Sequence, residues 1–367
     1  MSARDPVVTP GDGAPPYTVH IRNGLLEQMH ALLETEVAAH RYVIVTDENV
    51  ARLHGHALRA RLHDAGLRVD LIEVPPGEAS KTRPVWSTVT DRMLDDGVGR
   101  DGCILALGGG VIGDLAGFVA ATYMRGIPVV QIPTTLLAMI DASLGGKTGI
   151  DVPAGKNLVG AFHHPRAVLV DLRVLRTLPD AEFRAGLAEA VKHGAIADRD
   201  YLTWMGDALP AILAREPAAV ERLVRTSIEI KARTVSADAR ESGVRAILNF
   251  GHTVGHALEH LTDWRMVHGH AIAIGMVVEA RLGERLGFTE PGSATILGRL
   301  CSGFGLPVQL PPGVSPAAVA DAAVSDKKGR RGATRFALIH RPGTAFQLEG
   351  KWTIAVDRER FIEALSR

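Results

Sequence analysis

Two patterns in the sequence predict an α/β N-terminal domain followed by a mainly α-helical C-terminal domain. Up to about residue 178, short apolar runs alternate with amphipathic segments. That alternation is typical of βαβ units and predicts a parallel, Rossmann-like sheet. Beyond Leu178-Pro179, apolar residues recur at helical spacing and β-branched runs become sparse. We therefore expect one domain over residues 17–178 and a second over 179–367.

The individual elements follow from these patterns in chain order. The first 16 residues are rich in Pro, Gly and Asp, and we expect them to form a disordered tail. Five apolar runs then fit strands, at 42–46, 68–74, 102–107, 129–132 and 168–170. Amphipathic stretches between them fit helices, including 49–65 and 84–96. The second domain is expected to hold helices at 181–196, 217–238, 252–262 and 270–287 and a late strand at 336–339.

Composition excludes several classes of partner. Basic and acidic residues balance at 41 each, so no global charge favours nucleic acid or an acidic membrane as a partner. No apolar run reaches membrane-spanning length, and the N-terminus lacks the architecture of a signal peptide. The two cysteines, Cys103 and Cys301, form no CxxC pair, which fits a reducing compartment. We expect a cytoplasmic protein that acts on a small molecule.

A glycine run marks the first candidate site. Gly108, Gly109 and Gly110 end an apolar strand within the segment GGGVIGDLAGF. Glycines let a phosphate approach the backbone amides of the following helix, although a plain tight turn would leave the same pattern. The pattern GGGxxGD also differs from the common dinucleotide motif GxGxxG.

Polar residues after other strands strengthen the hypothesis of a bound dinucleotide. They lie at the carboxyl edge, where open α/β sheets bind ligands, although a lone Asp after a strand is usually a helix cap. These residues are Asp47 after the first strand, Glu78 and Lys81 after the second, and Thr134 and Thr135 after the fourth.

Residues of a candidate metal site lie in the second half. Glu189 and Lys192 share one face of an otherwise apolar helix, where buried charges need partners. His252 and His256 are one helical turn apart. Such a pair fits one metal, or one ligand with a proton-transfer residue, or two ordinary histidines. With His268, Glu189 and His252 would form a set that suits zinc and leaves a position open for substrate.

Several basic residues stand in apolar or glycine-rich surroundings, which favours binding of a small anion. For any one of them, a solvated surface group is the alternative, and for Lys327-Lys328 in isolation it is the better one. The basic residues considered are Arg125, Lys147, Lys156, Lys192, Lys231 and Arg245, together with the separate pair Lys327 and Lys328.

Taken in order, the motifs resemble those of the sugar phosphate cyclases, and among them the 3-dehydroquinate synthases. The resemblance runs from about residue 40 to about residue 340. It rests on GGGVIGDLAGF, the RG pair at 125 and 126, PTTLL, GGKTG, GKNLVGAF, LAEAVKHG, LNFGHTVGH, HGH and DKK.

The resemblance implies a dehydroquinate synthase-like fold that binds NAD in the α/β domain and one divalent metal, Zn or Co, in the helical domain. On matching positions it assigns NAD contacts to Asp47, Glu78, Lys81, Gly110, Val111, Ile112, Gly113, Asp114, Thr134, Thr135, Lys147, Lys156 and Thr177. It assigns the metal to Glu189, His252 and His268. It assigns substrate contacts to Arg125, Asp141, Lys147, Asn157, Lys192, Lys231, Arg245, Asn249, His256 and either Lys327 or Lys328.

The implied reaction turns 3-deoxy-D-arabino-heptulosonate 7-phosphate into 3-dehydroquinate and phosphate. It comprises transient oxidation by NAD, β-elimination of phosphate, return of the hydride and an aldol closure, with His256 as proton relay. A homodimer is also implied. Two residues depart from the common pattern: His270, where glutamate is frequent and where valiolone-forming cyclases carry histidine, and His193, where tyrosine is common.

Three other functions stay open at this point. A sister cyclase would make aminodehydroquinate, 2-deoxy-scyllo-inosose or a valiolone from another sugar phosphate. A metal-dependent polyol dehydrogenase of the glycerol dehydrogenase type would share the architecture, although its substrates carry no phosphate to explain the basic residues. A non-catalytic NAD-binding regulator would have little need of Glu189, His252, His256 and His268 together.

Overall fold

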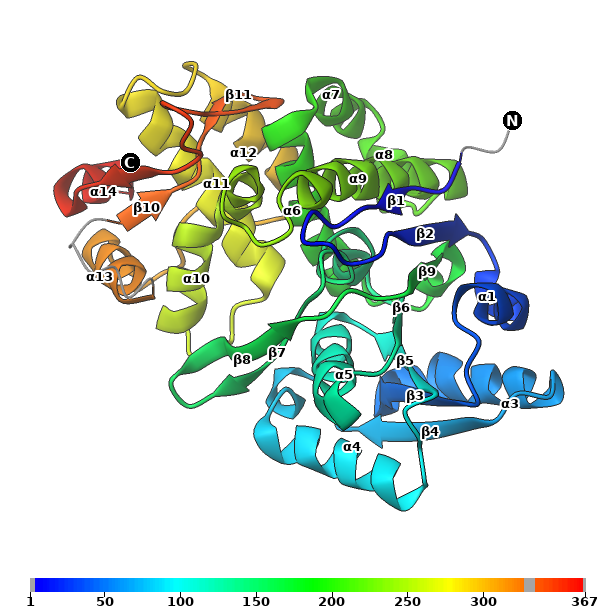
Figure 1. Cartoon of the computed structure of the whole chain (residues 1–367). Helices are drawn as coiled ribbons and strands as arrows, with labels where there is room; N and C mark the ends of the chain where they lie inside the picture. The colour runs from blue at the N-terminus through cyan, green and yellow to red at the C-terminus, as the bar shows by residue number, and fades with distance from the viewer. Residues whose placement is uncertain (1–3, 327–333, 366–367) are drawn as a thin grey trace. The chain divides into compact units, whose positions relative to one another are not determined.

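The computed structural model describes residues 4–326 and 334–365 (Figure 1). The chain divides into two compact units. The first contains the chain up to Pro179 together with Lys231–Ser236, and the second contains the rest. Lys231–Ser236 lies near the end of the long helix α9 (Pro217–Ala237), so a short part of this helix is grouped with the α/β unit rather than with the helical one.

The first unit is built on a seven-stranded sheet with the order β1-β2-β9-β6-β5-β3-β4. Neighbouring strands are parallel except for β1 and β2, which are antiparallel. The predicted parallel sheet is thus confirmed, while β1 and β2 were not expected. The strands are β1 (Val7–Val8), β2 (Tyr17–Arg22), β3 (Arg41–Asp47), β4 (Val69–Val74), β5 (Gly102–Gly108), β6 (Val129–Pro133) and β9 (Ala167–Asp171).

The prediction of a disordered tail is wrong for residues 4–16. Val8 is completely buried, and its strand pairs with β2. The Asp5 carboxylate lies 2.6 Å from Arg22 Nη1 and 3.2 Å from His20 Nδ1. Composition could not reveal this order, because a two-residue strand has no periodicity of its own and its partners come from β2.

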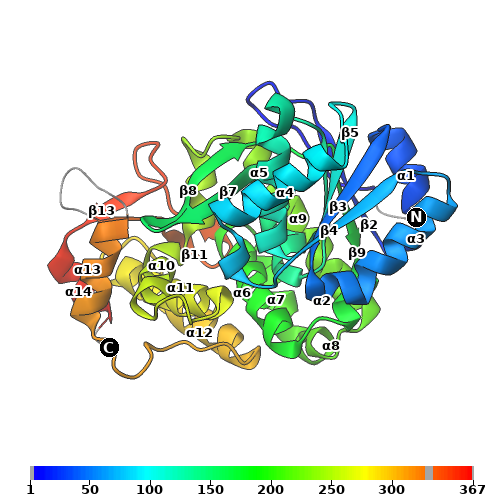
Figure 2. The ribbon, with the colours of Figure 1, turned by 90° about the horizontal axis from the view of Figure 1, so that it is seen from below.

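Helices cover both faces of the sheet, which explains why its central strands are continuously apolar. Every residue of β5 is buried, as are Val43, Ile44 and Val45 of β3. Figure 2 shows α4 (Arg83–Asp95) and α5 (Gly110–Thr122) on one face of the sheet. On the other face it shows α1 (Met29–Glu36) and α3 (His56–Asp64).

Strand order brings two predicted segments to one edge of the sheet. From β3 the chain passes to β4 on one side and then to β5 on the other, and Val45 of β3 pairs with Ala106 of β5. Asp47 and Gly108 therefore end neighbouring parallel strands. Open α/β sheets bind ligands at such a reversal of strand order.

Smaller elements complete the first unit. A hairpin of β7 (Lys147–Val152) and β8 (Gly155–Phe162) packs against α5. The one-turn helix α2 (Glu48–Val50) continues through 51–55 into α3, and a second short helical turn covers Ala138–Ala142.

The second unit is mainly helical, and the expected helices at 181–196, 217–238, 252–262 and 270–287 are present with ends that differ by at most two residues. The expected strand at 336–339 is divided, because Ala337 and Leu338 lie between two short strands. The helices are α6 (Asp180–Ala197), α7 (Arg199–Asp207), α8 (Leu209–Leu213), α9, α10 (His252–Leu261), α11 (His268–Arg285), α12 (Ser293–Gly303), α13 (Pro316–Asp326) and α14 (Arg358–Leu365). The antiparallel strand pairs are β10 (Thr334–Phe336) with β13 (Ile354–Val356), and β11 (Ile339–Arg341) with β12 (Thr344–Ala345).

Close packing of α10 on α11 depends on glycine. A Cβ atom on Gly275 of α11 would lie 1.9 Å from the carbonyl oxygen of Gly251, directly before α10. Gly251 itself has φ +84°, a conformation that other residues rarely adopt. These glycines let the backbones of the two helices approach each other at the start of α10.

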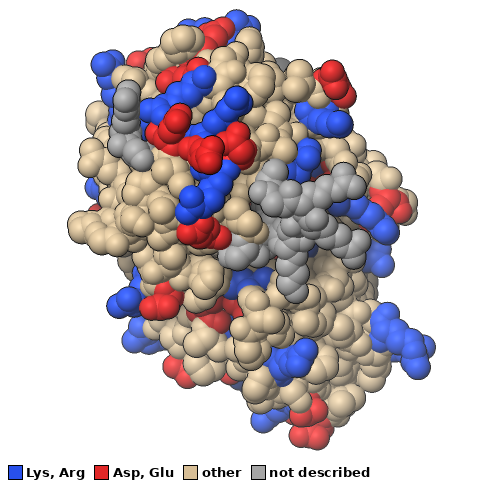
Figure 3. Space-filling model, turned by 90° about the vertical axis from the view of Figure 1, so that its left-hand side faces the viewer, with Lys and Arg blue, Asp and Glu red and all other residues tan. Residues whose placement is uncertain are grey.

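No described helix is both long and apolar enough to span a bilayer. Acidic and basic side chains are interspersed over the face shown in Figure 3.

The buried Asp171 gives a test of how the first unit is held together. Its carboxylate accepts hydrogen bonds from the N–H groups of Gly24 (2.8 Å), Leu26 (3.0 Å) and Arg173 (2.9 Å). Because Asp171→Ala leaves these donors without acceptors, we expect the free energy of unfolding to fall by about 3 kcal/mol. Chemical denaturation measures it, with Asp64→Ala, whose side chain is 83% exposed, as a control that changes it by less than about 0.5 kcal/mol. Equal effects of the two substitutions would contradict this role.

Candidate functional site

The glycine run forms the turn between β5 and α5. Gly108 ends the strand, Gly109 caps the helix without a side chain, and Gly110 is the first helical residue. A Cβ on Gly108 would lie 2.6 Å from Ile112 Cβ, so this approach of helix to strand requires glycine. The first amides of an α-helix have no acceptor within the helix and favour an anion. Here these are the N–H groups of Gly110, Val111 and Ile112.

Two threonines after β6 face the same turn. The Thr134 N–H donates to the Gly108 carbonyl (2.9 Å), and a Cβ on Gly109 would lie 3.1 Å from Thr135 Cγ2. Thr134 is 5% exposed, and its hydroxyl oxygen has no hydrogen-bond partner among the described residues. A buried hydroxyl without a partner costs about 1–3 kcal/mol. That cost is relieved by a ligand with a polar group at this position.

A charged cluster stands beside the first turn of α5. Lys81 Nζ lies 2.6 Å from Asp114 Oδ2 and 4.0 Å from Glu78 Oε1, and Lys156 Nζ lies 3.5 Å from the same Glu78 oxygen. Burial raises the pKa of Asp114 and of Glu78. Burial alone would lower the pKa of Lys81, but Asp114 and Glu78 outweigh it and raise that pKa. Four residues of the predicted NAD set thus lie together, with donors and acceptors that suit sugar hydroxyls.

Two further residues of that set have local partners. Asp47 Oδ1 accepts from the N–H groups of Asn49 (3.0 Å) and Val50 (3.1 Å), so it caps the helix that follows β3. The Thr177 hydroxyl donates to the Val174 carbonyl (2.8 Å) and lies 2.9 Å from His54 Nε2. Asp47 therefore has the helix-capping role that was the alternative to NAD binding, and it uses one of its two carboxylate oxygens for this role.

The predicted substrate residues of the first unit fall into two groups. Lys231, which is buried, pairs with Asp141 through Nζ and Oδ1 at 2.5 Å. Arg125, Lys147 and Asn157 are exposed. Arg125 and Asn157 have positive φ angles of 70° and 55°, and the Asn157 N–H donates to Asp151. Lys231 and Asp141 thus form an ion pair, whereas Arg125, Lys147 and Asn157 lie at the surface of this unit, in a turn and in the β7–β8 hairpin.

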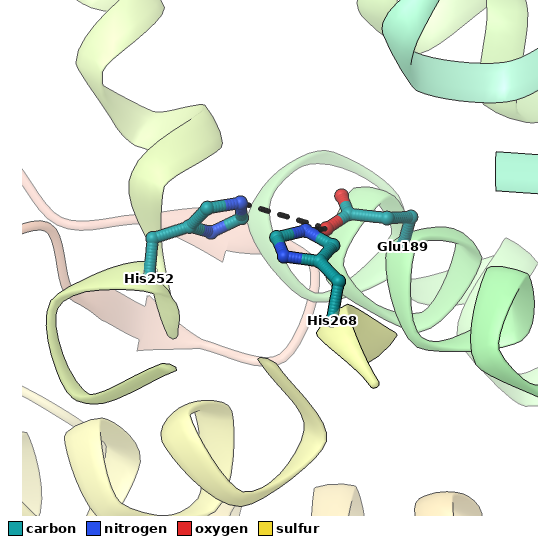
Figure 4. A group of neighbouring side chains, drawn as sticks. All are labelled: Glu189, His252 and His268. Atoms are coloured by element: carbon teal, nitrogen blue, oxygen red, sulfur yellow. Dashed lines mark ion pairs between the residues drawn. The ribbon is translucent and has the colours of Figure 1, made fainter. Parts of the chain in front are cut away.

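In the second unit, Glu189, His252 and His268 come together although they are far apart in sequence (Figure 4). Glu189 of α6 has no solvent exposure. His252 and His268 are the first residues of α10 and α11. The Nε2 atoms of both histidines lie 3.5 Å from Glu189 Oε1, and the ammonium of Lys192, 1% exposed, forms an ion pair with Glu189 Oε2.

These distances fit a metal ion. Ligand atoms about 2.1 Å from a tetrahedral zinc lie about 3.4 Å from one another, close to the two separations of 3.5 Å. His252 Nδ1 faces the Phe250 carbonyl (3.3 Å), and His268 Nδ1 faces Glu259 Oε1 (3.4 Å). When both Nδ1 atoms carry the hydrogen, both Nε2 lone pairs point to one place.

The electrostatics of Glu189, His252 and His268, called the trio below, also favour a bound cation. The pKa of His252 is well below its usual value, first because the residue is buried and second because the Lys192 ammonium is close. This imidazole is therefore neutral. Burial alone would lower the pKa of His268, but hydrogen bonds to Glu189 and Glu259 outweigh it and raise that pKa to about 10. A proton on His268 then takes the place of the positive charge that a metal would bring.

His256 lies beside the trio. Its ring centroid is 5.4 Å from that of His252 and 6.4 Å from that of His268. The residue is partly exposed and follows His252 by one turn of α10. An imidazole in this position can donate or accept a proton during a reaction.

The loop between α9 and α10 holds two more predicted substrate residues. Arg245 is 2% exposed, and its guanidinium donates to the Ala239 carbonyl. Asn249 donates through its side-chain amide to the Glu241 carboxylate. Asp238 fixes the loop by accepting from the N–H groups of Ser242, Gly243 and Arg245.

Sequence reasoning missed four acids at this site: Asp238, Glu241, Glu259 and Glu279. Only Glu259 had a clear signal, because it follows His256 by three residues and so shares the helix face of the histidines. The remaining predicted residues, Lys327 and Lys328, lie outside the described residues.

Comparison with known proteins gives matches over most of the chain. The family models 3-dehydroquinate synthase N-terminal and 3-dehydroquinate synthase C-terminal match residues 71–185 and 186–329. The 3-dehydroquinate synthase of Symbiobacterium thermophilum is 46% identical over 329 residues, which is 89% of this chain and 92% of the relative. The 3-dehydroquinate synthase of Desulforamulus reducens is 43% identical over 323 residues, which is 88% of this chain and 90% of the relative.

Several solved structures have a similar fold. A 2-deoxy-scyllo-inosose synthase complexed with carbaglucose-6-phosphate, NAD+ and Co2+ superimposes with a TM-score of 0.90 at 25% identity over 99% of both chains. The 2-epi-5-epi-valiolone synthase from Streptomyces hygroscopicus, with NAD+ and Zn2+ bound, has a TM-score of 0.83 at 27% identity over 100% of this chain and 98% of its own. A probable glycerol dehydrogenase from Sinorhizobium meliloti has a TM-score of 0.67 at 19% identity, over 95% of this chain and 94% of its own. This likeness shows a shared fold alone.

The role of Asp238 can be tested through pH. Burial alone would raise the pKa of Asp238, but the backbone hydrogen bonds from Ser242, Gly243 and Arg245 outweigh it and lower that pKa. A carboxyl group with a lowered pKa in the folded state stabilises the fold above its unfolded pKa of about 3.9, and this contribution is lost as the pH falls through the folded pKa. We therefore expect Asp238→Asn to lower the free energy of unfolding by about 2 kcal/mol at pH 7 and progressively less below about pH 4.

Denaturation curves at several pH values measure this difference, with the exposed Asp91→Asn as control. A deficit for Asp238→Asn that stays constant or grows toward acid pH would contradict the proposed anchoring of the loop.

Proposed function

The chain belongs to the 3-dehydroquinate synthase family, and from this premise we propose that it converts 3-deoxy-D-arabino-heptulosonate 7-phosphate into 3-dehydroquinate and phosphate. We propose that it does so as a phosphate-eliminating lyase of the shikimate pathway that depends on NAD and one divalent metal, Zn or Co. The observation that carries the proposal is the convergence of Glu189, His252 and His268 with both Nε2 atoms 3.5 Å from one carboxylate oxygen.

Glu189, His252 and His268 would hold the metal in the second unit. Two imidazoles and one carboxylate leave a coordination position for a substrate oxygen, as in catalytic zinc sites. In the first unit, the amides of Gly110 to Ile112 would receive the pyrophosphate of NAD. The cluster of Glu78, Lys81, Asp114 and Lys156 would bind its sugar hydroxyls, and the unpartnered Thr134 hydroxyl would find a partner there. When bound, NAD would supply reversible hydride transfer and the metal Lewis acidity.

The chain's own residues would supply binding and proton transfer. Lys192 and Arg245, both buried, are cations that can hold the phosphate and carboxylate of the substrate. Asn249, Lys231 and Asp141 would orient its hydroxyl groups, together with Arg125, Lys147, Asn157 and Lys328. His256 would take up and return a proton beside the metal ligands, a role that suits a partly exposed imidazole.

A sister cyclase activity is the second candidate, because similar folds are found in 2-deoxy-scyllo-inosose and valiolone synthases and because His270 departs from the common dehydroquinate synthase motif. Identity decides between the two. It is 43–46% to dehydroquinate synthases but 25–27% to those sister cyclases. The buried Lys192 ammonium beside Glu189, together with the buried Arg245, argues against a polyol dehydrogenase, whose substrates carry no phosphate.

We further propose that the protein works as a homodimer in the cytoplasm. Both cysteines are free and buried, and burial raises the pKa of the Cys301 thiol to about 12, so neither needs an oxidising compartment. Light scattering of the purified protein gives the oligomeric state directly.

Activity should depend on both cofactors. With the heptulosonate phosphate, NAD and zinc or cobalt, we expect release of phosphate and formation of 3-dehydroquinate without net NADH, because the hydride returns to the substrate. A chelator should abolish the reaction and added metal restore it. His252→Ala should lower kcat/KM by more than about 100-fold, since loss of residues that merely support a metal ligand already costs 10- to 100-fold. Product analysis and phosphate release measure these outcomes.

The matched control is His260→Ala, on the same helix two turns after His252 but exposed to solvent, which should leave activity unchanged. Turnover of another sugar phosphate in preference to the heptulosonate phosphate would favour a sister cyclase. Stoichiometric NADH would favour a dehydrogenase, and phosphate release that survives complete removal of metal would refute the proposal.

A further inference from the structure

We propose that Glu279 is a positioning residue that orients His252 toward the metal through the peptide group between Phe250 and Gly251. This inference rests on the proposed metal site and on the chain of hydrogen bonds behind His252.

Glu279 is a buried acid held by backbone donors. It lies on α11 with no solvent exposure, and its two carboxylate oxygens accept from the N–H groups of Gly251 (2.7 Å) and Val254 (3.1 Å). These donors flank His252 on either side in the chain. A buried carboxylate bound to the N-terminal amides of a helix is a strong, charge-assisted cap. It therefore fixes the backbone that carries His252.

The Gly251 N–H belongs to the same planar peptide group as the Phe250 carbonyl. That carbonyl lies 3.3 Å from His252 Nδ1. The carboxylate thus holds one end of the peptide while the imidazole donates to the other end. Negative charge on the N–H side strengthens the carbonyl as an acceptor, because hydrogen bonds in a chain polarise one another. With its hydrogen on Nδ1, His252 presents the Nε2 lone pair to the side of Glu189, 3.5 Å away.

The backbone is shaped for this arrangement. Gly275, one helical turn before Glu279, lies so close to Gly251 that any Cβ would be 1.9 Å from its carbonyl oxygen. A Cβ on Gly251 would in turn lie 2.7 Å from Met276 Cγ. Glycine at both positions brings the Gly251 amide within reach of the Glu279 carboxylate.

The two imidazoles of the trio are thus supported in different ways. His268 Nδ1 faces the Glu259 carboxylate directly, at 3.4 Å. His252 Nδ1 faces a peptide carbonyl whose other end is bound by the Glu279 carboxylate. Each imidazole therefore has a buried acid behind it, one in contact and one through a peptide group.

Glu279→Gln tests the inference, because the amide keeps the size of the side chain but places an N–H donor against one of the two backbone donors. The readouts are the Kd for zinc, from competition with a chelator on metal-free protein, and the visible absorption spectrum of the cobalt form. We expect the Kd to rise about 10-fold or more and the cobalt spectrum to change. Glu279→Asp, which keeps the charge but is shorter, should give a smaller rise and serves in place of Glu279→Gln if that variant does not fold.

Glu284→Gln is the matched control. Glu284 lies on the same helix, and its Oε1 accepts from the Ala294 N–H (2.9 Å) at the start of α12, so the same substitution removes the same kind of helix cap away from the metal ligands. It should lower thermal stability but leave the zinc Kd and the cobalt spectrum unchanged. Equal effects of Glu279→Gln and Glu284→Gln on the Kd would show a general loss of stability and overturn the inference.

Parent protein and His252→Ala separate this inference from the function on which it rests. If the parent binds no zinc, the proposed metal site fails and the role of Glu279 fails with it. If the parent binds zinc, His252→Ala does not, and the Glu279 variant that folds binds zinc as tightly as the parent with the same cobalt spectrum, only the role of Glu279 is refuted.

Discussion

A carboxylate with no access to water dominates the second unit. Glu189 is completely buried, and a buried charge must find an opposite charge at short range. Lys192 meets one of its oxygens, and two histidines from the starts of other helices meet the second. The pKa of His268, raised to about 10, shows how strongly this place favours positive charge. A divalent ion satisfies the same demand with better geometry, and the packing of α6, α10 and α11 serves to hold that geometry.

The first unit shows the same rule on a smaller scale. Lys81 is 4% exposed and is kept charged by Asp114, on α5, and by Glu78, in the short helical turn Glu78–Ser80 after β4. The glycines before α5 leave its first amides without side-chain cover, and the Thr134 hydroxyl beside them has no hydrogen-bond partner among the described residues. The uncapped first amides of α5 and the buried Lys81–Asp114 ion pair at this edge of the sheet suit a polar, anionic ligand.

The sequence predicts what is encoded by local pattern. Strand β5 is a continuous apolar run that ends in three glycines, and α10 and α11 follow apolar periodicity, so both their places and the positions of His252 and His268 near helix starts could be foreseen. Contacts between distant segments leave no such pattern. Glu279 is 28 residues from Gly251 in the chain, and the residues next to it in sequence do not indicate that both its oxygens accept hydrogen bonds from backbone amides. The order of residues 4–16 was missed for the same reason, because their partners lie elsewhere in the chain, on β2 and at His164 and Ser236.

Anomalous diffraction from crystals of the protein grown with cobalt or zinc would show where the metal ion binds. We expect one strong anomalous peak in the second unit, about 2.0–2.2 Å from a Glu189 oxygen and from the Nε2 atoms of His252 and His268. An ion bound elsewhere, or a Glu189 carboxylate that pairs only with Lys192 at saturating metal, would contradict this expectation.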